Sequence, residues 1–131
     1  MKFIDAITVD AGARAAEGSL FVDAGADYLK DHFPGAPMLP GLLMLEASVR
    51  TAAALWAACA PPVEGAVLEH VERLQMVRRV VPGETLRVHV ELAPDPVGHR
   101  TACFTARGAV DGETAVRARF RLRAATQEVT R

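Results

Sequence analysis

A proline-rich segment that leads directly into a long apolar segment constrains the fold of this chain more than any other feature. Three prolines within residues 31–40 disfavour helical backbone at the residue before each of them, so this segment is expected to form a stiff extended loop. From Gly41 to Ala60 nearly every residue is apolar or small, and Pro61 and Pro62 follow. The sequence therefore predicts that the loop feeds a single long helix.

The predicted helix is apolar on all sides, which in a soluble protein means that other elements enclose it. Its length is close to the roughly 20 residues that cross a bilayer. However, Glu46 and Arg50 lie inside it, and charged residues at the centre of a membrane span cost roughly 2.5–3.5 kcal/mol each. We therefore expect a core helix and no association with a membrane.

Composition and charge exclude several classes of function. A chain of 131 residues suits one domain, residues 1–131, and its formal net charge of -1 with 5% aromatic residues argues against nucleic-acid binding. Cys59 and Cys103 have neither metal-binding spacing nor a disulfide framework. The N-terminus lacks the long apolar core of a signal peptide. We expect a cytoplasmic protein without a metal site.

Alternation of apolar and polar residues predicts strands on both sides of the helix. Pro82-Gly83 and Asp111-Gly112 predict turns between them. The expected strands are residues 2–9, 14–22, one or two within 63–81 with 77–81 the most β-branched part, 86–92, 100–110 and 114–124, and a short helical turn is expected at 25–30. This order indicates an α+β domain in which a sheet curls around the helix and could pair its edges across a dimer.

Three positions in the central stretch carry groups suited to catalysis. His32, in the proline loop, is a candidate general base, or else a loop histidine bonded to backbone. The Gly41 amide would be the first free donor of the helix because Pro40 has no N–H; it could stabilise an oxyanion, or Pro-Gly could simply start the helix. Glu46 could be a buried carboxyl that acts as a general acid, or it could pair with Arg50 four residues later.

A family resemblance rests on the same stretch. The residues that carry it are His32-Phe33-Pro34-Gly35, Pro37, Pro40-Gly41 and Glu46-Ala47, with further similarity at residues 80–86 and 109–113. Over roughly residues 28–124, the chain resembles the 3-hydroxyacyl-[acyl-carrier-protein] dehydratases of type II fatty acid synthesis. The resemblance implies the hot-dog fold, an antiparallel sheet wrapped around one long central helix.

The resemblance also implies a reaction and a role for each residue. His32 would remove the α-proton of a (3R)-3-hydroxyacyl thioester, Glu46 would deliver a proton to the departing 3-hydroxyl, and Gly41 with Phe33 would bind the substrate, the Gly41 amide polarising the carbonyl. The product would be a trans-2-enoyl thioester, formed without a metal or cofactor on the phosphopantetheine of an acyl carrier protein. Because the family assembles its site across two subunits, a homodimer or a higher oligomer is expected.

Arg50 departs from the family pattern, which usually has glutamine there, and it could pair with Glu46 or reshape the tunnel. Such divergence would suit a specialised acyl pathway. Two other functions stay open: another hot-dog thioester enzyme, either a thioesterase or an enoyl hydratase, and a non-catalytic acyl- or carrier-binding subunit. The alternating arginines of the last strand would either steer an acidic carrier protein or form the solvated face of the sheet; they are Arg117, Arg119, Arg121 and Arg123.

Overall fold

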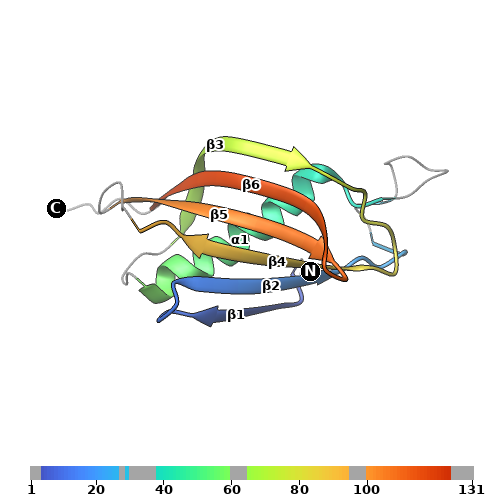
Figure 1. Cartoon of the computed structure of the whole chain (residues 1–131), viewed down its shortest axis with the longest axis horizontal. Helices are drawn as coiled ribbons and strands as arrows, with labels where there is room; N and C mark the ends of the chain where they lie inside the picture. Colours follow the sequence, from blue (N-terminus) through green and yellow to red (C-terminus); the bar gives the residue numbers. More distant parts are fainter. Residues whose placement is uncertain (1–3, 27–28, 30–37, 60–64, 95–99, 125–131) are drawn as a thin grey trace.

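The computed structural model describes residues 4–26, 29, 38–59, 65–94 and 100–124 (Figure 1). These residues form one helix and six strands. In chain order the elements are β1 (Ala6–Asp10), β2 (Ala15–Phe21), α1 (Gly41–Cys59), β3 (Ala66–Met76), β4 (Thr85–Leu92), β5 (Thr101–Val110) and β6 (Glu113–Ala124). The predicted α+β class is therefore confirmed.

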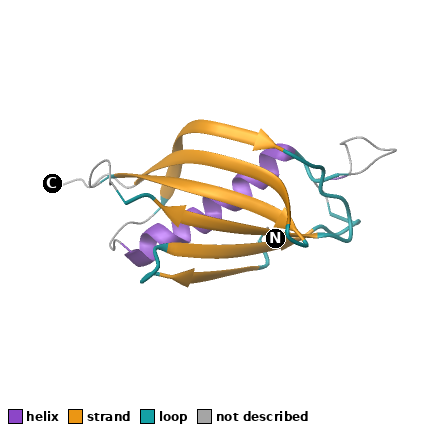
Figure 2. Ribbon diagram, in the orientation of Figure 1, coloured by secondary structure: helices purple, strands orange, loops and turns teal. Residues whose placement is uncertain are grey.

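The six strands form one sheet in the order β1-β2-β4-β5-β6-β3, and every neighbouring pair is antiparallel. Figure 2 shows α1 running across one face of this curved sheet, where it packs mainly on β2 and β4. The strands β1 and β3 form the two edges. This is the architecture that the hot-dog resemblance implied.

The core lies between α1 and the apolar face of the sheet. Along β4, and along β6 from Val116 onward, every second side chain is buried, because alternate residues of a strand point to opposite faces. Trp56 of α1 meets Phe104 of β5 edge-on at 6.3 Å between ring centroids, and Phe104 stacks on Phe120 of β6 at 5.9 Å. The predicted alternation in residues 86–92 and 114–124 is confirmed.

The helix is covered on one side only, so the expectation that other elements enclose it is wrong for the single chain. Its buried side includes Ala47 and Ala52, whereas Leu42 on the other side is 70% exposed. The helix is long and apolar enough to cross a membrane by length and composition, but half of its apolar window is buried in the domain. The core helix of a soluble domain can be equally long and apolar, and α1 packs against the sheet as a core helix does.

One predicted turn is confirmed, whereas one segment predicted to lie within a strand is a loop. The Asp111-Gly112 turn is confirmed: both residues have positive φ, 50° and 83°, and they join β5 to β6 as a tight hairpin. The β-branched run 77–81, in contrast, is not a strand, because β3 ends at Met76. The carbonyl of Val80 accepts a hydrogen bond from the Leu39 amide at 2.7 Å instead of pairing in the sheet.

Candidate active site

The structure describes part of the predicted site. His32 and Phe33 lie outside the described residues, so their predicted roles stay predictions. Gly41, Glu46 and Arg50 all lie on α1, with Gly41 as its first residue. The described part of the candidate site is therefore the N-terminal half of one helix, and its position depends on how that helix begins.

Backbone hydrogen bonds fix the start of α1. The Leu39 amide donates to the carbonyl of Val80, and the Leu43 amide donates to the carbonyl of Pro40 at 2.9 Å. Pro40 has no amide hydrogen and its fixed φ suits a helix start. No acceptor for the Gly41 amide is found within the part of the chain that the structure describes. A bound carbonyl oxygen could accept from this amide.

Glu46 and Arg50 form the ion pair that was one of the two alternatives for Glu46. Arg50 Nε donates to Glu46 Oε2 at 2.7 Å, and the two side chains are 43% (Glu46) and 49% (Arg50) exposed. The other alternative, a carboxyl buried in the helix body, is wrong for the single chain. Exposed pairs at this spacing contribute only about 0.3–0.5 kcal/mol to stability, so the pair matters little for folding.

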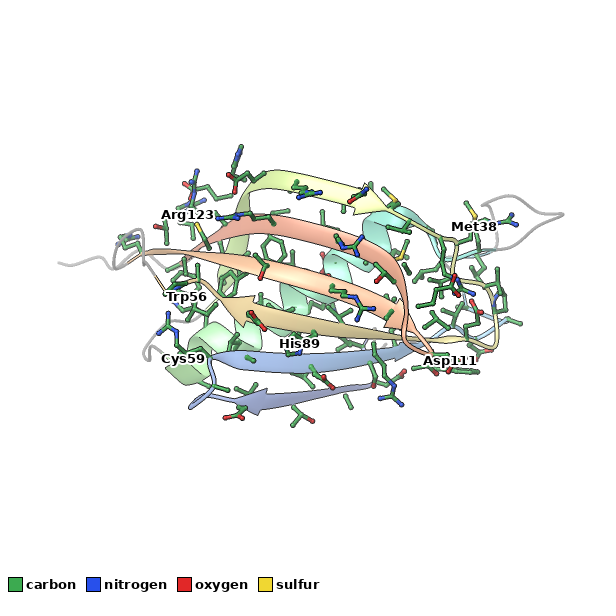
Figure 3. All side chains as sticks on the ribbon, viewed as in Figure 1. Met38, Trp56, Cys59, His89, Asp111 and Arg123 are labelled. Atoms are coloured by element: carbon green, nitrogen blue, oxygen red, sulfur yellow. The ribbon has the colours of Figure 1, made fainter. Side chains whose placement is uncertain are left out.

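A cavity of about 250 Å³ opens beside the first turn of α1. It lies at the end of the molecule where Figure 3 labels Met38, opposite the end that carries Trp56 and Cys59. The residues that line it are Met38, Leu39, Gly41, Met44, Met76, Val77, Arg78 and Arg79. The cavity therefore joins the start of α1 to the end of β3 and to the loop that follows it, residues 77–84.

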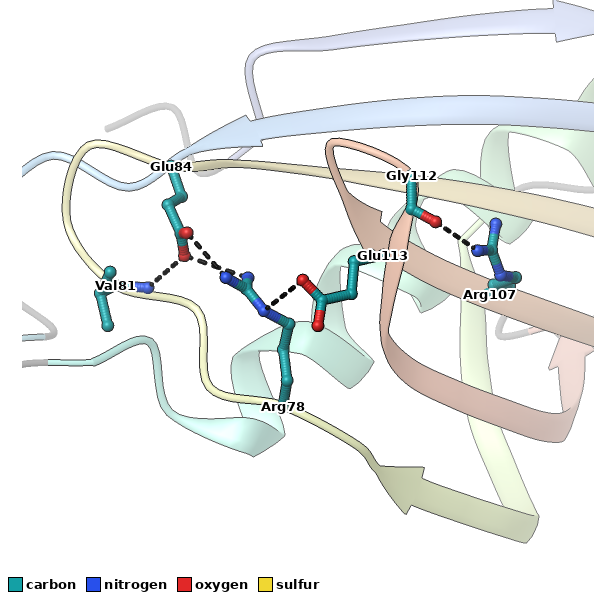
Figure 4. A network of polar contacts seen from close by, with 6 residues as sticks. All are labelled: Arg78, Val81, Glu84, Arg107, Gly112 and Glu113. Atoms are coloured by element: carbon teal, nitrogen blue, oxygen red, sulfur yellow. Dashed lines mark hydrogen bonds and ion pairs between the residues drawn. The ribbon is translucent and has the colours of Figure 1, made fainter.

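A polar clamp holds the loop 77–84 (Figure 4). Arg78 donates to both carboxylate oxygens of Glu84, at 3.2 and 2.9 Å, and the Val81 amide donates to Glu84 at 3.0 Å. Arg78 also pairs with Glu113 at 3.5 Å. The hydrogen bond from Arg78, with the one from Val81, lowers the pKa of Glu84 below its ordinary value of 4.5, although burial opposes the shift. The same bond with Glu84 raises the pKa of Arg78.

The clamp between Arg78 and Glu84 was not among the features predicted from the sequence. Its only sequence signal is an arginine six residues before a glutamate, across the Pro82-Gly83 turn. Gly83 has a φ of 93°, which favours glycine, and its amide donates to the Val22 carbonyl at 2.8 Å. The loop is thereby tied to the segment before α1 and to the end of β2, so the cavity wall has several independent anchors.

Two of the four alternating arginines on the outer face of the sheet pair with glutamates of β3. Arg119 pairs with Glu72 and Arg121 with Glu69, each at 3.0 Å between nitrogen and oxygen. These pairs favour the solvated-face interpretation of the alternating arginines over a steering surface. Among the residues that the structure describes, no cluster of histidine, cysteine, aspartate and glutamate could hold a metal ion.

Comparisons with known proteins decide the family. A family model described as ApeI dehydratase matches residues 8–118. The chain belongs to the ApeI-like dehydratase family. The FabZ 3-hydroxyacyl-[acyl-carrier-protein] dehydratase of Acetivibrio thermocellus is 34% identical over 119 residues, covering 83% of this chain and 73% of that protein. The FabZ of Ruegeria sp. is 29% identical over 120 residues, covering 89% and 75%.

Solved structures of ApeI-like and other proteins confirm the hot-dog fold. The dehydratase heterocomplex ApeI:P from Xenorhabdus doucetiae contains a chain with a TM-score of 0.69 and 23% identity, covering 94% of this chain and 99% of that one. A putative thioesterase from Ralstonia eutropha has a TM-score of 0.70 and 18% identity, covering 92% and 82%. At these identities the likeness concerns the fold alone, so the chemistry is argued from the family and the site.

Proposed function

We propose that this protein converts (3R)-3-hydroxyacyl thioesters, carried on an acyl carrier protein, to trans-2-enoyl thioesters in fatty acid or related acyl-chain synthesis. Its membership of the dehydratase family carries the proposal, because the match extends through the helix that bears Gly41 and Glu46. The reaction breaks a C–H bond beside the carbonyl and the C–O bond of the 3-hydroxyl, and it releases water. It needs a base, an acid and a donor to the carbonyl oxygen.

The chain offers a candidate for each of these roles. His32 takes the α-proton, the Gly41 amide donates to the carbonyl oxygen, and Glu46 gives a proton to the hydroxyl that leaves. Gly41 and Glu46 are five residues apart on α1, or roughly 7.5 Å along the helix axis. The Glu46 side chain and a short acyl group bound at the Gly41 amide can together span this distance. The acid role requires the Glu46 carboxyl to face the 3-hydroxyl of the substrate, whereas in the single chain it accepts a hydrogen bond from Arg50.

A second copy of the chain completes the site in this proposal. The open side of α1 carries Leu42 and Glu46, and β3 is an eleven-residue edge strand with Val67 and Leu68 partly exposed. An exposed edge strand with apolar residues is a natural pairing surface. A homodimer formed there covers Glu46 and brings it to His32 of the partner subunit, and higher oligomers are compatible with it. We place this assembly in the cytoplasm.

The direct test is to follow enoyl formation from a 3-hydroxyacyl thioester on carrier protein. His32→Ala and Glu46→Gln are each expected to lower kcat by roughly 10²–10⁴-fold, the usual contribution of a general base or acid. Full activity in either variant would contradict the assigned roles. Release of free thiol without enoyl product would instead indicate a thioesterase.

A non-catalytic subunit of a heterocomplex is the second candidate function. Two observations favour it: the exposed ion pair of Glu46 with Arg50, and the occurrence of an ApeI-like chain in a dehydratase heterocomplex. Under this alternative the purified chain binds carrier protein but forms no enoyl product. Turnover by the purified chain alone would exclude it.

A further inference from the structure

Methionines dominate the cavity beside the first turn of α1. The chain contains four methionines in 131 residues, and three of them, Met38, Met44 and Met76, line this one cavity. Methionine is unbranched and polarizable, so it adapts its shape to irregular apolar groups. A wall of this kind suits a flexible aliphatic ligand.

The side chain of Met76 occupies the space directly in front of Gly41. A Cβ atom built on Gly41 would collide with both Sδ and Cε of Met76. Glycine at position 41 therefore does more than allow a helix to start, since it leaves room for this thioether. Conversely, any group that approaches the Gly41 backbone from the cavity has to displace the end of the Met76 side chain.

The cavity has one adaptable wall and one fixed wall. Met76 is the last residue of β3 and is 52% exposed in the single chain, so the packing of its own chain does not hold its side chain in one rotamer. Leu39 and Met44 on the opposite wall are 1% and 3% exposed and belong to the core. The size of the group that fits beside Gly41 therefore depends mainly on Met76.

The charge at the cavity complements a ligand with an anionic end. Arg78 is neutralised by Glu84 and Glu113. The neighbouring Arg79 is exposed, and its side chain has no ion pair among the residues that the structure describes. The phosphate of a phosphopantetheine arm lies at the far end of the arm from the acyl group, so an exposed arginine at the rim of the apolar cavity complements the arm where it leaves the cavity.

We infer that Met76 sets the size of the acyl group admitted beside Gly41, and that the cavity takes the apolar acyl part of a phosphopantetheine-linked thioester. This inference rests on the dehydratase function proposed above. It makes Met76 a specificity-determining residue, distinct from the residues assigned to proton transfer.

The test compares substrate preference between variants. We would measure kcat/KM for 3-hydroxyacyl thioesters of increasing length and branching with the wild type, Met76→Ala and Met76→Leu. The ratio of kcat/KM for the bulkiest over the shortest substrate is expected to rise by about tenfold or more in Met76→Ala, and to stay near wild type in Met76→Leu, which keeps the volume. Gln75→Ala is the matched control, because adjacent strand residues point to opposite faces.

An unchanged ratio in Met76→Ala, or an equal change in Gln75→Ala, would overturn the inference. Calorimetric binding of non-reactive amide analogues with the same acyl chains separates it from the proposed function. If the wild type forms no enoyl product, the proposed function fails, and the binding preferences of the same variants still decide the role of Met76. If the wild type binds no acyl analogue, the inference fails.

The contribution of Arg79 to substrate binding is tested in the same experiment. Arg79→Gln is expected to raise KM severalfold for phosphopantetheine-linked substrates, and to leave KM unchanged for acyl thioesters of N-acetylcysteamine, which lack the phosphate. Equal effects on both kinds of substrate would overturn the orientation of the ligand in the cavity.

Discussion

Arg50 donates a hydrogen bond to the carboxylate that the dehydratase signature assigns to proton delivery. The contact is short but exposed, so it contributes little to folding. The spacing of the two residues in the sequence predicted that they could meet. It could not decide between pairing and burial, because that choice depends on how much of α1 the sheet covers.

Replacing Arg50 tests whether this pair restrains catalysis. Arg50→Gln removes the hydrogen bond that holds the Glu46 carboxylate against its own helix, so kcat is expected to rise, by up to about tenfold, which corresponds to about 1.4 kcal/mol in the barrier. The free energy of unfolding should change by no more than about 0.5 kcal/mol. Steady-state kinetics and chemical denaturation measure the two quantities.

Arg50→Lys is the control for this prediction, because it keeps the charge at the same position. Its kcat should stay close to that of the wild type. If the glutamine and lysine variants are equally slow, Arg50 contributes through its shape or through a contact with substrate, and its pair with Glu46 does not restrain catalysis.

Among the elements, the strands followed from the sequence more reliably than the loops. Residues 86–92 and 114–124 alternate strictly, and a sheet with one buried face allows only one register for such a pattern. The run 77–81 is more β-branched than either strand but is a loop, since Val80 bonds to Leu39 and Arg78 bonds to Glu84. Both partners lie outside the run 77–81, so the β propensity of the run itself could not predict these contacts.

The clamp on the loop 77–84 gives the protein a pH-dependent stability. The pKa of Glu84 is lower in the folded chain than its ordinary value of 4.5, so the folded state binds fewer protons than the unfolded state in that range. The contribution of Glu84 is therefore fully present above about pH 4.5 and is lost as the pH falls through the lowered pKa. Glu84→Gln should lower the free energy of unfolding at pH 7, and this difference from wild type should shrink as the pH falls below 4.5.

Denaturant unfolding of both proteins at several pH values between 7 and 3 would measure this effect. Glu72→Gln is the matched control, because Glu72 also pairs with an arginine but lies on the exposed outer face. Its difference from wild type should be small at every pH. A constant difference between Glu84→Gln and wild type would show that the clamp does not titrate in this range.

At the scale of the whole molecule, the composition of α1 points beyond the single chain. An all-round apolar helix predicted full enclosure, whereas the sheet of one chain covers only one side and leaves Leu42, Glu46 and Arg50 accessible. The distribution of apolar residues around a helix predicts that its surface will be covered. It does not predict whether the same chain or a second copy covers it. The sequence therefore predicted the fold more completely than the assembly.

Mixing two inactive variants tests whether the site is shared between subunits. If His32 of one subunit works with Glu46 of the other, a dimer of one His32→Ala chain and one Glu46→Gln chain has one intact site and one doubly altered site. Random exchange at equal amounts makes half of the dimers mixed, so about a quarter of the wild-type activity should return. Enoyl formation is measured after unfolding and refolding the variants together, with each variant refolded alone as the control. A site contained within one chain would leave the mixture as inactive as its components, because no chain would then carry both groups.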